Sequence, residues 1–216
     1  MRSLNFWKNS LTEVPASVWE TPGLESLILA DNQLTVLPEG IGALTDLHTL
    51  DLGHNLLTDL PESLGRLTAL TGYLYLHDNR LTSLRESLFA HLARLRYLNV
   101  SDNRLTRLPG TIGDLTSLEE FRADNNQLDS LPGLFGHLTR LHELHLRNNH
   151  LREVPAPLRG LPRLAYLDLR GNPFTHVPDW VADLPHLQKI DLRWVTLDGG
   201  SAVFDRLEAR GCRVLL

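Results

Sequence analysis

Residues 141–151 read LHELHLRNNHL, an instance of the pattern LxxLxLxxNxL, in which x is any residue. The pattern recurs along the chain, and one asparagine marks each copy. Those asparagines are Asn9, Asn32, Asn55, Asn79, Asn103, Asn126, Asn149 and Asn172. Successive asparagines lie 23, 23, 24, 24, 23, 23 and 23 residues apart. A fixed period in the twenties predicts a solenoid, in which each turn supplies one short strand and a return segment and packs only on its neighbours.

Each repeat carries two apolar positions separated by a single residue. The pairs are Leu27/Leu29, Leu50/Leu52, Leu74/Leu76, Leu98/Val100, Phe121/Ala123, Leu144/Leu146, Leu167/Leu169 and Ile190/Leu192. Because side chains alternate between the two faces of a strand, both members are expected to point into the core, and the residues between them to be exposed. The asparagine ends the strand, and its short amide can bond main-chain groups of its own and adjacent turns.

The return segments carry a proline at one fixed place: Pro15, Pro38, Pro61, Pro109, Pro132, Pro155 and Pro178. Proline fixes φ and lacks a backbone donor, which suits an extended or short 3₁₀ connection on the convex side. Where Arg85 takes this place, the segment has no helix breaker and one extra residue, so a true helical turn is predicted near residues 86–94. The other 24-residue step comes from Gly72, which predicts a bulge or a wider turn before a strand.

The pattern ends where a glycine pair interrupts it, after the ladder of asparagines has stopped at Val195. The stretch SAVFDRLEARG then predicts a helix with Ser201 as its N-cap and Gly211 just past its end. The final CRVLL is expected to form a closing parallel strand, reached by a right-handed crossover. The predicted organisation is a solenoid of about nine repeats over residues 1–197 and a cap of one helix and one strand over residues 198–216.

The unit LxxLxLxxNxLxxLPxxIxxLxx resembles the 23-residue class of leucine-rich repeats, which occurs in bacterial intracellular and effector proteins and in eukaryotic Ras-pathway scaffolds. The ending LDLRWVTL…LEARGCRVLL resembles the C-terminal cap of bacterial members. The resemblance implies an α/β fold: a curved right-handed solenoid with a parallel sheet on its concave face, and with 3₁₀ or short helices and extended segments on its convex face. It also implies a protein partner on the concave sheet and no catalytic residues.

Bulk composition narrows the function classes. The net charge of −5 argues against a general nucleic-acid binder, and a single cysteine permits no internal disulfide. No apolar run approaches the ~20 residues of a membrane span, and the opening MRSLNFWKNS lacks the apolar stretch of a signal peptide. We therefore expect a cytoplasmic protein without membrane or nucleic-acid partners, or alternatively a secreted effector without a cleavable signal peptide.

The first repeat begins inside its own strand, since Leu4 and Phe6 correspond to Leu27 and Leu29 one turn later. Solenoids usually need a polar cap at each end, and a bare strand edge invites pairing with another chain. Either the sequence is trimmed at its start, or Trp7 and nearby side chains shield this edge, or a second chain covers it. A monomer is the expected state. The alternative is an edge-to-edge dimer, in which the chain is a structural, self-associating repeat protein.

All four tyrosines fall on outward positions of the predicted sheet, whereas phenylalanine takes core positions. Large rigid rings with a polar tip are typical anchors of protein interfaces. The alternative is that tyrosine simply favours strands and half-exposed positions. The clustering of Tyr73, Tyr75 and Tyr97 beside His77 favours a binding surface for a protein or peptide.

A row of Arg147, Arg170 and Arg193 is expected along three adjacent strands, which lie ~4.8 Å apart. Acidic residues, among them Asp168 and Asp191, fall within one position of this row, so it could be a self-neutralising surface network. The other interpretation is a docking stripe for an acidic or phosphorylated segment of a partner, where bidentate arginine contacts are favoured.

The predicted partner-binding residues combine these two groups with their neighbours on the concave face. They are Tyr73, Tyr75, His77, Tyr97, Arg122, His145, Arg147, Tyr166, Arg170, Arg193 and Trp194.

Candidates for metal binding or catalysis are weaker. His142, His145 and His150 with Glu143 could suggest a metal site, but the alternating pleat puts His142 and His145 on different faces. No Ser/His/Asp grouping and no GxxxxGK[ST] phosphate loop stands out. The sequence therefore predicts no metal and no cofactor.

Cys212 has Arg210 and Arg213 nearby, which could lower the pKa of its thiol. It also opens an apolar strand, where a buried structural thiol is expected. The prediction is an interaction module that is not an enzyme, with a hydrolase or ligase that uses Cys212 or the histidines as the remaining alternative.

Overall fold

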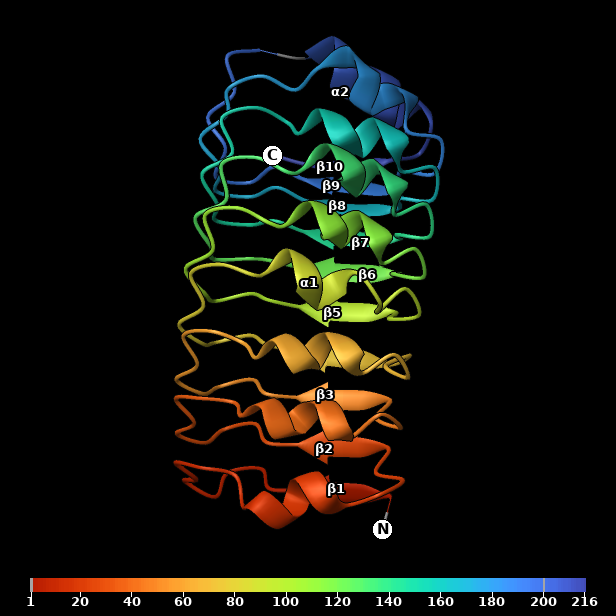
Figure 1. Ribbon diagram of the computed structural model, residues 1–216. Helices are drawn as coiled ribbons and strands as arrows, with labels where there is room; N and C mark the ends of the chain where they lie inside the picture. The colour runs from red at the N-terminus through yellow and green to blue at the C-terminus, as the bar shows by residue number, and fades with distance from the viewer. Residues whose placement is uncertain (1, 200) are drawn as a thin grey trace.

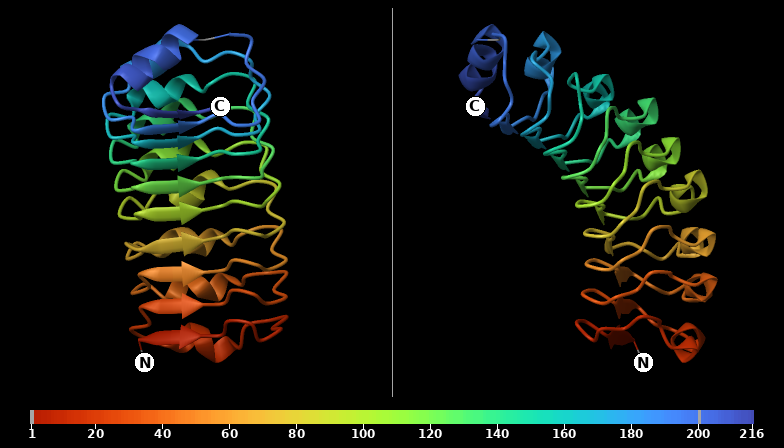
Figure 2. Two further views of the ribbon diagram at one scale, coloured as in Figure 1. Left: turned by 180° about the vertical axis from the view of Figure 1, so that it is seen from behind. Right: turned by 90° about the vertical axis from the view of Figure 1, so that its left-hand side faces the viewer.

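The computed structural model describes residues 2–199 and 201–216, without the side chain of residue 201. A single ten-stranded parallel sheet runs through it, and the strands follow one another in the sheet in chain order (Figure 1). The strands are β1 (Ser3–Asn5), β2 (Ser26–Ile28), β3 (Thr49–Asp51), β4 (Tyr73–Tyr75), β5 (Tyr97–Asn99), β6 (Glu120–Arg122), β7 (Glu143–His145), β8 (Tyr166–Asp168), β9 (Lys189–Asp191) and β10 (Arg213–Leu215). The side view in Figure 2 shows the strands along the inner side of an arc and the helical turns along its outer side.

The outer side is built from short helices. The 3₁₀ helices are η1 (Ala16–Glu20), η2 (Glu39–Ala43), η3 (Glu62–Arg66), η4 (Gly110–Asp114), η5 (Gly133–His137), η6 (Ala156–Gly160) and η7 (Asp179–Asp183). Each begins directly after a proline of the predicted column, which precedes it in an extended conformation with φ between −54° and −74°. The fixed φ of proline thus sets the point where each return segment turns into its helix.

The inward apolar pairs form one continuous core. Strand register places equivalent residues of successive repeats side by side, as in Leu4 beside Leu27 and Leu98 beside Phe121. All sixteen residues of the predicted pairs are at most 1 % exposed. Burying a leucine side chain contributes about 1.5–3 kcal/mol, so the core of stacked repeats is the main source of stability.

From Asn32 onward, each repeat asparagine satisfies main-chain groups of two turns. The side-chain nitrogen of Asn126 donates to the carbonyls of Val100 at 3.0 Å and Ala123 at 3.3 Å, and its side-chain oxygen accepts from the backbone N–H of Leu105 at 2.9 Å. The same bonds recur at every asparagine of the ladder from Asn32 to Asn172. The predicted role of the asparagines is confirmed.

A left-handed backbone conformation precedes each asparagine of the ladder. These residues are Lys8, Asp31, His54, Asp78, Asp102, Asn125, Asn148, Gly171 and, in the ninth repeat, Trp194, with φ between 50° and 66°. Asp, Asn and Gly tolerate this conformation, which is uncommon for bulky residues. In the ninth repeat, a bulky tryptophan takes this left-handed position, and Val195 follows it instead of an asparagine. Trp194 is therefore the unusual residue at this position.

The two irregular repeats differ locally. Where proline is absent, α1 (Glu86–Phe89) replaces a 3₁₀ helix, but it is shorter than the predicted span of 86–94 because the N–H of Leu92 bonds the carbonyl of Phe89 in a turn back toward β5. Gly72 lies in a bend before β4, and there the ladder between β3 and β4 starts one residue later than in the other repeats. The predicted irregularity at Gly72 is confirmed.

The C-terminal segment folds as α2 (Ser201–Ala209) followed by β10, which pairs in parallel with β9. The helix lies over the last repeat (Figure 1), and its own side chains Phe204 and Leu207 are buried. Its end lies slightly before the predicted one, and Gly211 follows with φ of 82°. Gly200 and the N-cap role of Ser201 lie outside the described residues. The division into a solenoid of residues 1–197 and a cap of residues 198–216 stays a prediction.

Two further sequence expectations concern the chain ends and membranes. At the first edge of the sheet, Leu4 and Phe6 are half-buried and Trp7 is 58 % exposed. Within residues 2–199 and 201–216, no helix combines the length and the apolar character needed to cross a membrane.

Candidate functional site

Three tyrosines from β4 and β5 form one aromatic cluster on the concave face. Ring centroids are 5.0 Å apart for Tyr75 and Tyr97, 5.5 Å for Tyr73 and Tyr97, and 5.8 Å for Tyr73 and Tyr75. Tyr73 is 48 % exposed, and the other two are half-buried. The structure therefore brings together these three predicted residues and places them outside the core, whereas Phe89, Phe121, Phe135 and Phe174 are buried.

The phenol groups of Tyr75 and Tyr97 stay neutral at physiological pH. Partial burial raises the pKa of Tyr97 to about 12 and also raises the pKa of Tyr75. A neutral phenol presents an apolar ring together with one hydroxyl that can donate or accept a hydrogen bond. Tyr75 and Tyr97 thus contribute uncharged rings with polar tips to the cluster.

His77 extends the cluster toward the strand ends. Its ring lies 5.9 Å from that of Tyr75 and 4.8 Å from that of His54, whose Nδ1 is 2.5 Å from Asp78. The ring of His77 fills the space above Gly53, where a Cβ atom would lie only 2.3 Å from it. Its Nδ1 is buried without a hydrogen-bond partner. His77 is therefore held as a packed, neutral ring.

Acidification should reduce the contribution of His77 to stability. Burial, followed by the charge of His54, lowers the pKa of His77 in the folded state. The unfolded chain then binds the extra proton more readily, because its histidine pKa stays near the ordinary value of about 6.5. The stabilisation by neutral His77 is present above that unfolded value and is lost as pH falls through the lowered folded value.

Urea unfolding at pH 7.5 and pH 5 measures this effect. We expect wild type to lose more stability between the two pH values than His77→Gln does. The exposed His91→Gln is the matched control and should follow wild type. Equal losses in wild type and His77→Gln would contradict the assignment.

The middle of the sheet carries a charged group next to the tyrosines. Glu120 and Glu143 lie opposite each other on β6 and β7, and Arg122 and His145 are the next concave pair. The Nε atom of Arg122 binds Glu120 at 2.5 Å, so this arginine is already occupied by a carboxylate. The ring of His145 packs against that of Tyr166 at 4.9 Å.

Further along, two carboxylates that were expected to be exposed are buried. Asp168 and Asp191 are each 0 % exposed, because the arginines of the next column fold over them. Arg170 binds Asp168 at 2.5 Å and approaches Asp191 at 3.6 Å, and Arg193 binds Asp191 at 2.8 Å. For Arg170 and Arg193 the structure therefore shows the self-neutralising network.

The pKa values of Asp191 and Arg170 are shifted in the directions that keep both side chains charged. Burial raises the pKa of Asp191, but the hydrogen bonds from Arg193 and the charges of both arginines outweigh it and leave the pKa below its ordinary value. The pKa of Arg170 is raised, mainly by its hydrogen bond to Asp168. Both groups stay charged over the physiological range.

Arg147 differs from the other two members of the row. Its backbone N–H donates to Asp124 at 2.8 Å, but within the described part of the chain its buried Nε has no hydrogen-bond partner. The predicted stripe is thus not uniform: two guanidiniums are neutralised by buried carboxylates, and one has a donor left over.

Trp194 lies beside the Asp/Arg network and is 70 % exposed. Its ring is 5.6 Å from the guanidinium carbon of Arg170, a favourable cation–π arrangement. It occupies the left-handed position at φ of 66°, which is strained for a bulky side chain. Trp194 thus exposes a large apolar ring to solvent and adopts a strained backbone conformation. Both features make it a candidate for contact with a partner.

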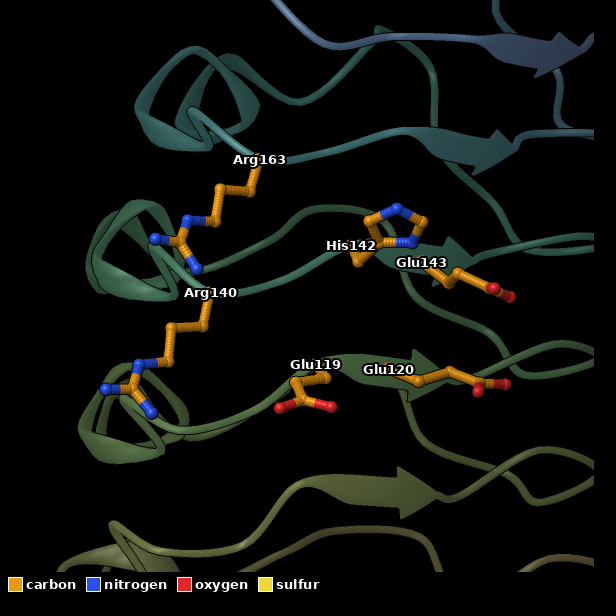
Figure 3. A pocket seen from close by; sticks show the side chains of 6 residues that line it. All are labelled: Glu119, Glu120, Arg140, His142, Glu143 and Arg163. Carbon is orange, nitrogen blue, oxygen red and sulfur yellow. The ribbon is translucent and has the colours of Figure 1, made fainter.

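A shallow groove of 430 Å³ runs along the side where β6 and β7 begin (Figure 3). Its lining mixes both charges: Glu119, Glu120, Arg140, His142, Glu143 and Arg163. Glu119 is already paired with Arg96, at 3.0 and 2.7 Å. Glu120 is likewise bound by Arg122, so two of the carboxylates that line this groove are already paired with arginines.

The comparisons with known families agree with the repeat geometry. The pattern described as leucine rich repeat matches residues 73–128, 125–174 and 139–194, and the pattern described as two copies of leucine rich repeats matches residues 22–66. This chain belongs to the leucine-rich repeat proteins. No curated protein matches it by sequence.

Solved structures of other leucine-rich repeat proteins share the fold. Internalin C2 from Listeria monocytogenes superposes with a TM-score of 0.75 at 24 % identity, over 88 % of this chain and 80 % of that one. A leucine-rich repeat protein from Leptospira interrogans gives a TM-score of 0.51 at 24 % identity, over 99 % of this chain and 77 % of that one. These similarities confirm the predicted α/β solenoid and bear on the fold alone.

Within this leucine-rich repeat solenoid, sequence reasoning missed one residue group. It considered His145 with Glu143, His142 and His150, whereas the structure brings His145 and Glu143 together with Glu120. The available signal was the 23-residue period, because Glu120 occupies the position of Glu143 one repeat earlier. His142 is exposed and lies outside this group, as the alternating pleat predicts.

Cys212, the alternative catalytic candidate, is buried at 3 % exposure. Burial raises the pKa of its thiol, although the charge of Arg210 acts in the opposite direction. The guanidinium of Arg210 instead donates to the carbonyl of Leu184 at 2.6 Å. A buried thiol with a raised pKa fits the structural interpretation of Cys212.

Proposed function

We propose that this leucine-rich repeat protein binds a protein or peptide partner on its concave face and catalyses no reaction itself. The observation that carries the proposal is the cluster of Tyr73, Tyr75 and Tyr97, whose mutually packed rings face the hollow side of the arc. The proposal places this tyrosine cluster at the centre of the interface.

The physical argument rests on preorganisation. Each ring already contacts the other two, so little side-chain freedom remains to be lost when a partner covers them. Buried tyrosines are frequent hot spots because they combine a large apolar area with a hydroxyl. Phenylalanine at these positions would lack the polar tip.

The C-terminal flank of the proposed interface consists of Arg147, Tyr166 and Trp194. Trp194 is exposed and would take an apolar side chain of the partner, and the half-buried Arg147 would supply positive charge toward an acidic group. Arg122, Arg170 and Arg193 are bound to carboxylates of this chain and would set orientation more than affinity. His77 and His145 support the neighbouring tyrosine rings.

The double variant Tyr75→Ala/Tyr97→Ala tests the proposal. The partner is first captured from a cell lysate, identified and purified, and its affinity is then measured by calorimetry. Each truncation of a hot spot costs about 2 kcal/mol, or roughly 30-fold in affinity, so loss of both should weaken binding by several hundredfold if the two effects add.

Val36→Ala/Leu134→Ala is the matched control, because it removes two exposed apolar side chains away from the tyrosine cluster, 68 % and 45 % exposed. It should bind like wild type. Unchanged affinity of the tyrosine variant, with a melting temperature that confirms folding, would show that the partner uses another surface.

Self-association through β1 is the second candidate, because half-buried Leu4 and Phe6 and exposed Trp7 lie at that sheet edge. Sedimentation velocity at high concentration distinguishes the two, and a monomer throughout excludes pairing. The cytoplasmic location and bacterial origin predicted from the sequence remain part of the proposal.

A further inference from the structure

We propose that Glu120, Glu143 and His145 form a binding site for a divalent metal ion of the zinc class. One ligand atom from each residue lies within 4.8 Å of the other two. The three residues come from adjacent strands β6 and β7 and project from the same concave face. The site is independent of the proposed function, since it needs no partner.

The strongest geometric argument is the separation of the two closest donors. The Nε2 atom of His145 lies 3.5 Å from a carboxylate oxygen of Glu143, at the outer limit of a hydrogen bond. Two donors held at about 2.0–2.2 Å from a tetrahedral zinc ion lie roughly 3.4 Å apart. The pair therefore has the spacing of two ligands on one metal and is too long for a strong hydrogen bond.

The second argument is the orientation of His145. Its side chain is 10 % exposed, it packs against the ring of Tyr166, and its Nε2 atom is directed at Glu143. A polar ring that is nine-tenths buried, and whose polar contact to Glu143 within residues 2–199 and 201–216 is long, has coordination capacity to spare. Packing has fixed the ring in position before any metal arrives.

The third argument concerns charge. Glu120 and Glu143 are directly opposite each other in the parallel ladder, an arrangement that is unfavourable for like charges. Arg122 binds Oε1 of Glu120 at 2.5 Å and so offsets the charge of one carboxylate. A divalent cation between the glutamates would relieve their mutual repulsion, and Arg122 would orient Glu120 from outside the coordination shell.

The donor set selects the class of metal. Mg²⁺ and Ca²⁺ favour all-oxygen sites, whereas an imidazole combined with carboxylates suits zinc and its neighbours in the first transition series. The side chain of Glu143 is 39 % exposed, so an ion can enter from the concave side. Three protein ligands leave one position open toward solvent, as in non-structural zinc sites.

The test uses the full chain after removal of metal with a chelator. Calorimetric titration with zinc chloride should give one site per chain, and cobalt(II) should give the intense visible absorption of tetrahedral coordination. Glu143→Gln should weaken zinc binding by at least about tenfold, since loss of even an outer-shell partner typically costs 10–100-fold.

His142→Gln is the matched control: it changes an exposed histidine next to Glu143 in sequence but outside the site, and it should bind zinc like wild type. Glu120→Gln serves as a second ligand variant, and circular dichroism verifies folding of all variants. Absence of one-site zinc binding by wild type would overturn the proposal. So would equal affinities of wild type and both glutamate variants, which would place the ion elsewhere.

Discussion

Replacement of Asn126 by alanine is expected to destabilise the protein by about 3 kcal/mol or more, because each buried main-chain group left unpaired costs roughly 1–3 kcal/mol. Asn126 is 5 % exposed and bonds the carbonyl of Val100 and the N–H of Leu105 in the preceding turn. Alanine supplies neither partner, and the closed bend admits little water. Urea unfolding followed by circular dichroism measures the loss.

Gln127→Ala is the matched control, since it removes an exposed amide one residue further on. It should leave stability within about 0.5 kcal/mol of wild type, as most surface substitutions do. If Asn126→Ala and Gln127→Ala were equally mild, the asparagine ladder would not be a major source of stability.

Replacement of Arg170 by methionine is the second large expected effect. Asp168 and Asp191 are fully buried, and Arg170 lies 2.5 Å from the first and 3.6 Å from the second. Methionine keeps much of the side-chain volume but leaves a buried carboxylate without its cation. Breaking such a pair typically costs about 3–5 kcal/mol, and thermal unfolding at neutral pH should show a loss of that size.

Two variants separate the ion pair from side-chain size. Exposed Arg152→Met should have little effect. Adding Asp168→Asn to Arg170→Met removes the unpaired charge, so part of the loss should be recovered, and the double-mutant cycle gives the coupling. No recovery would mean that Arg170 stabilises the sheet by packing on Trp194 and not by charge.

The fold could be predicted from sequence because the same pattern of leucine, asparagine and proline recurs in almost every repeat. Leucine at alternating positions determines which face is buried, and the asparagine and proline columns determine where each strand ends and each helix begins. The same alternation separates Tyr75 on the concave face from Phe121 in the core. The exposed positions of the tyrosines followed from pattern alone.

The candidate sites could be predicted only in part, because side-chain direction is not periodic. Asp168 occupies an outward position yet is buried, since Arg170 folds back over it. Glu120 joins His145 only through lateral contact between neighbouring strands. The end of α1 at Phe89 likewise depends on where the chain must return to the sheet.

The constant register between repeats has a consequence for how this protein could diversify. Residues such as Leu4 and Leu27, one repeat apart in sequence, lie side by side on strands separated by ~4.8 Å. Gain or loss of a whole repeat between the tyrosine cluster and Trp194 would change their separation by one such increment and reproduce every ladder bond. Unequal recombination could therefore change the distance between the tyrosine cluster and Trp194 in steps of one repeat, while the core packing of each repeat stays the same.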